Sequence, residues 1–398
     1  MVKLTAKFSF MEEYKLSDIA EVRTGPFGSQ LHNEDYVSTG TPIVTVEHLG
    51  NRRFSKQNLP LVSDDDKKRL SKYLLQEGDI VFSRVGSVDR CSYVTSAEND
   101  WLFSGRCLRV RCGNNCHPLF LYYYFCKESV KQYIKSIAVG ATMPSINTKL
   151  MAEIPILLPK LEEQRCIADI LSSFDDKIEL NRRINDNLEQ QAQALFKSWF
   201  VDFEPFRGGE FVDSELGLIP KGWRVVSLGE VTKQITEKVG NREDVTVLSP
   251  INSGELVLSE EYFTKQVFSK DLSKYLIVNP LSFAYNPARI NIGSIGLNTF
   301  DFVGCVSPVY VVFECEPNYQ YFFDFFKRTA MFKDEVALRA IGGVRQSLGY
   351  NDLSLIKIIY PTSDVVVEFN NLYLKMKEVM IKNTDQNEKF ISLRDSLL

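Results

Sequence analysis

The chain has 398 residues, which is enough for two or three domains. Its composition, with 44% hydrophobic and 25% charged residues, is ordinary for a globular protein; we find no run of 18 uninterrupted apolar residues and no apolar signal region at the N-terminus, which argues against a membrane or secreted protein. The net charge of −4 excludes a strongly basic nucleic-acid binder and implies that any DNA binding is helped by a partner.

The eight cysteines are scattered, so reduced thiols in a cytoplasmic protein are expected. Cys112, Cys116 and His117 lie close together in the sequence. A tetrahedral zinc site needs four ligands, usually from two clusters, and no second cluster follows. We therefore expect no metal site.

Residues 1–160 are predicted to form a domain that mixes helices and strands. Short strands are expected at 43–46, 79–82, 108–111 and 154–158, because these runs are rich in β-branched and other apolar residues. A single helix is expected from Leu119 to Ile137, with Phe120, Tyr124 and Tyr133 on or near its buried face.

Residues 161–205 are predicted to form a long helix. The segment from Leu161 to Trp199 has no Gly or Pro, and its apolar residues follow a 3–4 spacing over more than four heptads, the pattern of a coiled-coil seam. Its 39 residues would span about 58 Å, so pairing with a second helix is favoured over packing on its own domain. The seam positions assigned here are Ile167, Leu171, Phe174, Ile178, Asn181 and Leu188.

Residues 206–362 and 363–398 repeat this arrangement. Tyr73-Leu74-Leu75 recurs as Tyr275-Leu276-Ile277, the glycine turn at Gly140 recurs at Gly342, and Pro159 recurs as Pro361, all at an offset of 202 residues, while the segment around Leu16 recurs near Leu228 at about 212. A strand is expected from Val309 to Phe313, a helix from Tyr319 to Val336, and then a second long helix. The seam of that helix is assigned to Phe369, Met376, Met380, Asn383, Phe390 and Leu397.

The order domain, helix, domain, helix predicts an antiparallel helix pair. The first helix would lead from the first domain to the second, and the second helix would return. The product would have pseudo-two-fold symmetry, which suits duplex DNA, whose strands are themselves related by two-fold axes.

Several motifs resemble those of the specificity subunits of type I restriction–modification enzymes. They are Gly25-Pro26-Phe27-Gly28-Ser29-Gln30-Leu31, Glu77-Gly78-Asp79-Ile80-Val81-Phe82-Ser83-Arg84-Val85-Gly86, Ser198-Trp199-Phe200-Val201-Asp202-Phe203, Ile219-Pro220-Lys221-Gly222-Trp223 and Tyr285-Asn286-Pro287-Ala288-Arg289-Ile290. The resemblance covers essentially the whole chain. One departure is that the second helix has no counterpart of the tail from Trp199 to Phe206, so the distal end of the second spacer is short.

This resemblance implies an α+β fold in which two similar target-recognition domains are separated by two long antiparallel helices that form a coiled coil. Each domain would recognise one half of a bipartite double-stranded DNA target. The helices would set the gap between the halves and dock two modification subunits, which methylate adenine, and ATP-dependent restriction subunits would complete the endonuclease. The chain itself would hold no cofactor and no catalytic residue.

Base recognition requires Arg, Lys, Asn, Gln, Ser or Thr side chains, and other basic groups hold phosphates. Candidates occur in three loops of the first unit and in the equivalent loops of the second. In the first unit they are Arg52, Arg53, Lys56, Arg84, Ser87, Arg90, Thr142, Ser145, Asn147 and Lys149. In the second they are Lys265, Lys270, Arg289, Asn291, Arg345, Gln346 and Ser347.

Two other functions fit the sequence less well. An adenine methyltransferase holds its flipped base with an Asn/Asp-Pro-Pro-aromatic turn, and Asn286-Pro287-Ala288-Arg289 lacks the second proline and the aromatic residue. A scaffold that uses only the coiled coil would not need two elaborate domains with basic, polar loops.

Overall fold

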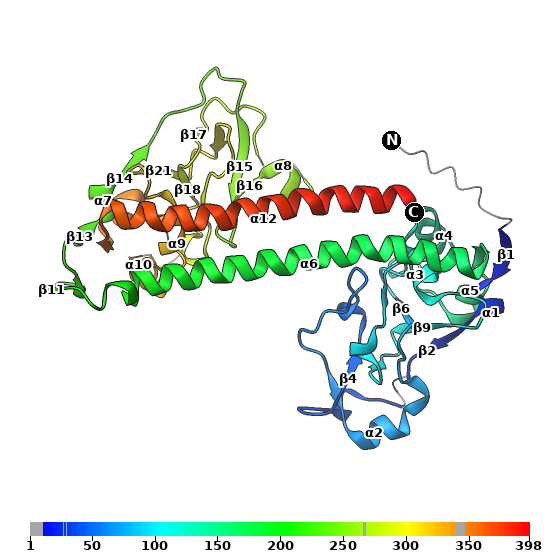
Figure 1. The fold of residues 1–398 in the computed structure, drawn as a ribbon. Helices are drawn as coiled ribbons and strands as arrows, with labels where there is room; N and C mark the ends of the chain where they lie inside the picture. Colours follow the sequence, from blue (N-terminus) through cyan, green and yellow to red (C-terminus); the bar gives the residue numbers. More distant parts are fainter. Residues whose placement is uncertain (1–10, 27, 29, 266–267, 340–346) are drawn as a thin grey trace. The chain divides into compact units, whose positions relative to one another are not determined.

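The computed structural model describes residues 11–26, 28, 30–265, 268–339 and 347–398. The chain divides into two compact units. The first comprises Met1–Asn181 and Thr384–Leu398, and the second comprises Arg182–Asn383. Each unit contains a domain of mixed helices and strands together with part of two long helices, α6 (Leu161–Phe200) and α12 (Ser363–Leu397), drawn green and red in Figure 1.

The domain of the first unit contains ten strands and five helices within its described residues. In chain order they are β1 (Glu12–Lys15), α1 (Leu16–Ile19), β2 (Ala20–Thr24), β3 (Tyr36–Val37), β4 (Thr41–Val44), β5 (Leu61–Val62), α2 (Asp64–Arg69), β6 (Ile80–Ser83), β7 (Cys91–Tyr93), β8 (Leu102–Phe103), β9 (Cys107–Cys112), α3 (Pro118–Cys126), α4 (Glu128–Ile137), α5 (Thr148–Ala152) and β10 (Pro155–Leu158).

These strands form two four-stranded sheets and one separate pair. The main sheet has the order β2-β9-β6-β7 and is antiparallel. The second sheet has the order β3-β5-β4-β8, with β4 and β8 parallel. The pair joins β1 to β10. All four residues of β6 are buried, as expected for a central strand that is covered on both faces.

The domain of the second unit has a comparable set of elements. In chain order they are β11 (Phe211–Ser214), β12 (Gly217–Pro220), β13 (Arg224–Ser227), α7 (Leu228–Val231), β14 (Thr232–Ile235), β15 (Thr246–Pro250), β16 (Leu256–Leu258), α8 (Ser259–Tyr262), β17 (Leu276–Val278), β18 (Phe283–Tyr285), β19 (Ile295–Leu297), β20 (Gly304–Val306), β21 (Val311–Cys315), α9 (Gln320–Phe326), α10 (Ala330–Arg339), α11 (Tyr350–Leu353) and β22 (Lys357–Tyr360).

The main sheets of the two domains share one strand order, and the second sheets share a parallel pair. The order β14-β21-β18-β19 corresponds to β2-β9-β6-β7, and the parallel pair β15 and β20 corresponds to β4 and β8. Glu12 pairs with Leu158 in the first unit, and Arg224 pairs with Tyr360 in the second. These partners differ by the same offsets, 212 and 202, that the sequence shows, so the predicted duplication is confirmed.

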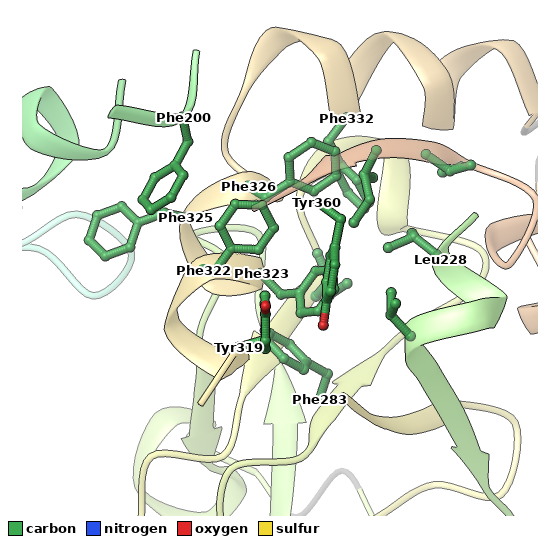
Figure 2. Close-up of a cluster of buried hydrophobic side chains, with 14 of the residues drawn as sticks. Phe200, Leu228, Phe283, Tyr319, Phe322, Phe323, Phe325, Phe326, Phe332 and Tyr360 are labelled. Carbon is green, nitrogen blue, oxygen red and sulfur yellow. The ribbon is translucent and has the colours of Figure 1, made fainter. Parts of the chain in front are cut away.

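Aromatic side chains dominate the core of the second unit. Figure 2 shows Phe322, Phe323 and Phe326 of α9 on the side of Tyr360 of β22, whereas Phe325 points towards Phe200. The rings of Tyr319 and Tyr360 stack with their centroids 4.3 Å apart. Large rings bury much apolar surface with few rotatable bonds, which explains how so short a helix is held in place.

The two long helices pair in antiparallel fashion within each unit. In the first unit, Asn181 Nδ2 on α6 donates to Asn387 Oδ1 on α12 over 3.0 Å. In the second unit, Asn383 Nδ2 on α12 donates to Asn185 Oδ1 on α6 over 2.8 Å. At the offset of 202 residues, Asn181 corresponds to Asn383, and Asn185 corresponds to Asn387, so the two hydrogen bonds join equivalent residues. The helix pair therefore repeats the duplication of the domains.

Two predicted helices are each divided in the structure. The expected helix from Leu119 to Ile137 is interrupted at Lys127, whose ψ of 132° is extended, and it forms α3 and α4. The expected helix from Tyr319 to Val336 likewise forms α9 and α10. Neither break is marked by Gly or Pro, so tertiary packing determines them.

Two residues in these predicted elements are more exposed than expected. Tyr133, placed near the buried face of the predicted helix, is 41% exposed on α4. The strand expected at Val309 begins at Val311, and Val309 is 71% exposed. Among the described residues, no helix is long and apolar enough to cross a membrane.

Candidate nucleic-acid interface

The main sheet of the first unit projects a polar loop from its central strand. Gly78, with φ of 92°, makes the turn before β6, and Asp79 is buried there. The two carboxylate oxygens of Asp79 accept from Arg111 Nε and Nη2, each over 2.7 Å, and fix the strand to β9. The motif around Gly78 thus holds β6 rigidly, and residues 84–90 leave its end.

Backbone hydrogen bonds tie this loop to the glycine turn. Gly86 N donates to Pro144 O over 2.8 Å, and Ile146 N donates to Arg84 O over 3.0 Å. Val85 and Ser145 form an isolated β-bridge. Two of the predicted loops, about 60 residues apart in the sequence, therefore form one surface. It carries the predicted residues Arg84, Ser87, Arg90, Thr142, Ser145, Asn147 and Lys149.

These side chains differ in how free they are. Ser87, Arg90, Thr142 and Lys149 are exposed. Asn147 is also exposed, but its Oδ1 accepts from Leu150 N over 2.9 Å and caps α5. Two further side chains also make contacts within the domain. Ser145 Oγ donates to Val139 O over 3.1 Å, and Arg84 is half-buried, with Nη1 donating to Gly105 O over 3.1 Å.

A basic cavity of about 550 Å³ opens beside this surface. Ser87 and Arg90 line it from the loop, and Lys131 and Lys135 line it from α4. Asp89 forms an ion pair with Lys135 over 3.0 Å, so three cations face one carboxylate. Positive charge in a concave site attracts phosphate. The two lysines were not predicted, although their spacing of four residues on a helix indicates a shared face.

A second cavity, of about 780 Å³, is also lined by Arg90. Glu47, Tyr36 and Arg106 line this second cavity as well. Arg106 is exposed, and its carbonyl accepts from Arg84 N over 2.8 Å. This arginine was also missed by the sequence analysis. Its place between Gly105 and the start of β9 is the signal that could have found it, since loops at strand ends often carry recognition residues.

The loop that contains the candidates Arg52, Arg53 and Lys56 makes ion pairs within the first unit. Arg52 Nη1 is 2.7 Å from Asp176 Oδ1 on α6, and the side chain is only 12% exposed. Arg53 Nε is 3.1 Å from Glu179 Oε2. Lys56 Nζ is 3.9 Å from Glu98 Oε1 and lies over the Trp101 ring. The two arginines therefore face the helix.

The second unit repeats the connection between loops. Leu348 N donates to Pro287 O over 3.1 Å, and Tyr285 Oη donates to Leu348 O over 3.1 Å. The loop after β18 is thereby joined to the segment before α11, as in the first unit. Asn286 Oδ1 accepts from Ala288 N over 3.0 Å, so the side chain that would bind a flipped base in a methyltransferase instead closes its own turn.

The predicted residues of the second unit are exposed where they are described. Arg289 and Asn291 flank Ile290 in the loop after β18, and Ser347 lies in the joined segment. Lys265 and Lys270 are exposed in the segment between α8 and β17. Arg345 and Gln346 lie outside the described residues.

Most predicted seam residues are buried or half-buried within their own unit. In the first unit, Leu171, Ile178 and Asn181 are buried, Ile167 is half-buried, and the rings of Phe174 and Phe390 are 5.8 Å apart. In the second unit, Phe369 is fully buried, and the half-buried residues are Leu188, Met376, Met380 and Asn383.

One seam residue is exposed. Leu397, at the last residue of α12, is 58% exposed, so the structure does not place it in the seam. The partner residue Asn387, by contrast, was missed by the sequence analysis, although it lies 202 residues after Asn185, which follows the same spacing in the first helix.

Comparison with known proteins finds relatives of one kind. Residues 9–190 match the type I restriction modification DNA specificity domain. The chain is 26% identical to the type I restriction enzyme MjaIX specificity subunit of Methanocaldococcus jannaschii over 96% of this chain and 90% of that protein. The chain is therefore similar to type I restriction enzyme specificity subunits along nearly its whole length. By this similarity we assign it to the recognition subunits, which are not the catalytic ones.

Two further comparisons agree with this assignment. The HindI specificity subunit of Haemophilus influenzae is 24% identical over 97% of both proteins. The crystal structure of a type I S subunit from M. genitalium matches with a TM-score of 0.61 and 14% identity, covering 100% of this chain and 96% of that one. At this identity the structural likeness supports the fold alone.

Proposed function

We propose that this specificity subunit recognises a bipartite double-stranded DNA target, with each mixed domain contacting one half. The observation that carries the proposal is a surface that occurs twice. In each unit, the loop after a central strand is hydrogen-bonded to the segment before a short helix. These bonds involve Pro144 and Ile146 in the first unit and Leu348 in the second. Two similar surfaces on one chain suit a target with two halves. The paired helices would set the gap between those halves and dock two modification subunits, which methylate adenine, and restriction subunits would join this assembly.

The domain limits proposed for this function follow the sequence. Residues 1–160 and 206–362 would be the target-recognition domains, and 161–205 and 363–398 the spacer helices. Base contacts would come from exposed side chains such as Ser87, Arg90 and Arg289, and Arg106 joins this set. Because the net charge is −4, binding by the chain alone should be weak and most evident at low salt.

Methylome sequencing tests the whole proposal. The chain is expressed with its modification subunit in a host that lacks adenine methylation, and methylated adenines are mapped. We expect one motif with two defined blocks separated by a gap of fixed length and undefined sequence. A continuous motif, or the same methylation without the chain, would contradict the proposal. Incubating the purified chain alone with a labelled methyl donor should transfer no label.

The basic cavity supports a more specific prediction. Lys131→Ala should weaken binding of the assembled complex equally for all DNA sequences, because a lysine–phosphate contact carries no base information. The slope of log K against log salt should fall in magnitude by about 0.9, the value for one phosphate contact. The measurement is a salt titration of binding to the target and to an unrelated duplex.

Lys15→Ala is the matched control for that titration. Lys15 lies in the same domain, but its ammonium is paired with Glu153 over 2.6 Å and does not line the basic cavity. Its salt slope should equal that of the unsubstituted chain. A Lys131→Ala slope that also equals it would remove the cavity from the DNA contact surface.

A further inference from the structure

A network of polar contacts joins the first domain to the two long helices within the first unit. Asp175 on α6 is its centre: Oδ1 accepts from Arg394 Nη1 of α12, and Oδ2 accepts from Tyr123 Oη of α3, both over 2.7 Å. Burial raises the pKa of the Tyr123 hydroxyl, so it stays protonated and remains a donor. One carboxylate thus holds three elements together.

The next residue on α6, Asp176, connects this network to the loop that contains Arg52 and Arg53. Asp176 pairs with Arg52, and Glu179, one turn further, pairs with Arg53. Residues three apart on a helix lie on one face, so Asp176 and Glu179 present a short acidic track to two consecutive arginines. Burying the guanidinium of Arg52 to 12% exposure is costly unless it is paired, and this pairing explains its burial.

The backbone around Arg52 is as constrained as its side chain. Arg52 has a φ of 65°, in the left-handed region that non-glycine residues rarely adopt. Its carbonyl accepts from Tyr93 N over 2.9 Å. Gly50 N donates to Ser92 Oγ, and Ser92 Oγ donates to Gly50 O, both over 2.9 Å. Such strain persists only where the surroundings fix it, and here both neighbours are residues of β7.

These contacts connect α6 to the candidate interface through a few residues. Asp176 holds Arg52, the Arg52 backbone is bonded to β7, and β7 begins directly after the loop that carries Ser87 and Arg90. A rotation of the loop relative to α6 would therefore have to break the ion pair. The second unit has a similar contact, because Arg328 pairs with Glu189 of α6 as well as with Asp324.

We propose that Arg52, through its ion pair with Asp176, is a positioning residue that fixes the first recognition surface on α6 and thereby makes the subunit strict about the length of the gap between the two DNA half-sites. This rests on the proposed bipartite recognition. Successive base pairs are related by a rise of about 3.4 Å and a rotation of about 35°, so accepting one base pair more or less requires the surface to move by that amount. A held loop resists this movement, and a released loop permits it.

The test measures gap preference and base preference separately. The complex of the chain with its modification subunits is bound to duplexes whose gap has the length found by methylome sequencing, or one base pair more or fewer. It is also bound to a duplex with one changed base pair in the first half. For Arg52→Ala, we expect the preference for the correct gap to fall by about tenfold, roughly 1.4 kcal/mol. The preference for the correct base pair should stay unchanged.

A charge exchange provides the rescue. Arg52→Asp combined with Asp176→Arg restores the ion pair in reverse and should recover the gap preference, whereas a direct contact of the Arg52 guanidinium with DNA would not predict recovery. Arg53→Gln, at a side chain 40% exposed, is a milder variant that keeps the proposal testable if Arg52→Ala fails to fold, and it should relax the gap in the same direction.

Three outcomes separate the possibilities. An unchanged gap preference in both Arg52→Ala and Arg53→Gln would overturn the positioning role while leaving bipartite recognition intact. Equal losses of gap and base preference would also overturn it, because Arg52 would then contact or support the bases. An unsubstituted complex with no gap preference would overturn the proposed function itself, and the positioning role with it.

Discussion

Replacing Asp324 with alanine is expected to destabilise the second unit by about 3–5 kcal/mol, the cost of leaving a buried charge without its partner. Asp324 Oδ1 lies 2.6 Å from Lys327 Nζ, and their side chains are 10% and 4% exposed. The ammonium also donates to Gly254 O and Ile295 O, over 2.6 and 3.1 Å, so it cannot leave the core easily. Chemical denaturation of the full chain, followed by hydrogen exchange in peptides of α9, measures the loss.

The size of this loss should depend on pH. Burial lowers the pKa of Lys327, and Asp324 opposes that effect. Without the carboxylate, the folded pKa falls further below its unfolded value of about 10.4. Since the folded chain then binds fewer protons than the unfolded chain, stability rises with pH between the two pKa values. The difference between variant and unsubstituted chain should therefore shrink as the pH is raised from 7 towards about 10.

Two control variants distinguish the buried charge from other effects. Glu378→Ala removes an ion pair with Lys382 in which both side chains are about two-thirds exposed, at 65% and 67%. It should cost at most about 0.5 kcal/mol. The double variant Asp324→Leu with Lys327→Met removes both charges and should be more stable than Asp324→Ala. A double variant no more stable than the single one would show that the charge on Lys327 is not the cause.

Much of the fold could be predicted from the sequence because its largest features are repeated or periodic. The offsets of 202 and 212 residues predict equivalent domains, and the strand pairs of Glu12 with Leu158 and Arg224 with Tyr360 confirm them. The 3–4 spacing predicts α6 from Leu161 almost to its last residue. Repeats and periodic spacings of this kind can be recognised in the sequence without knowledge of tertiary contacts. The division of the predicted helix at Lys127 could not be recognised in this way, because no Gly or Pro marks it and packing determines it.

The candidate site was predicted less completely, since its geometry depends on distant contacts. Arg84 and Ser145 could be nominated from loop composition, but only the bridge between Val85 and Ser145 brings their loops together. Arg52 resembles any exposed basic loop residue until its partner on α6, 124 residues away, is known. Lys131 lies on a helix whose sequence gives no indication that a loop from β6 lies beside it. Recognition surfaces assembled from several loops share this difficulty.

Replacing Phe369 with alanine is expected to cost about 3–5 kcal/mol, the usual loss when a fully buried phenylalanine leaves a cavity. Phe369 on α12 is 0% exposed, and its ring contacts side chains from both of the other helices at this point. The ring centroids of Phe200 on α6 and Phe325 on α9 lie 5.2 and 5.5 Å away, both nearly perpendicular to it. Edge-to-face contacts of this kind add stabilisation beyond the buried area.

The position of this ring makes the expected effect more than a loss of stability. Because Phe369 joins α12 to α6 and α9 at once, its removal should loosen the helix pair and the domain of the second unit together, and hydrogen exchange should accelerate in α9 and in residues 363–383. Leu374→Ala, at a residue 41% exposed on the same helix, should change stability by about 0.5 kcal/mol or less. Faster exchange in α9 alone would contradict the shared core, since α12 would then be held by contacts that do not involve Phe369.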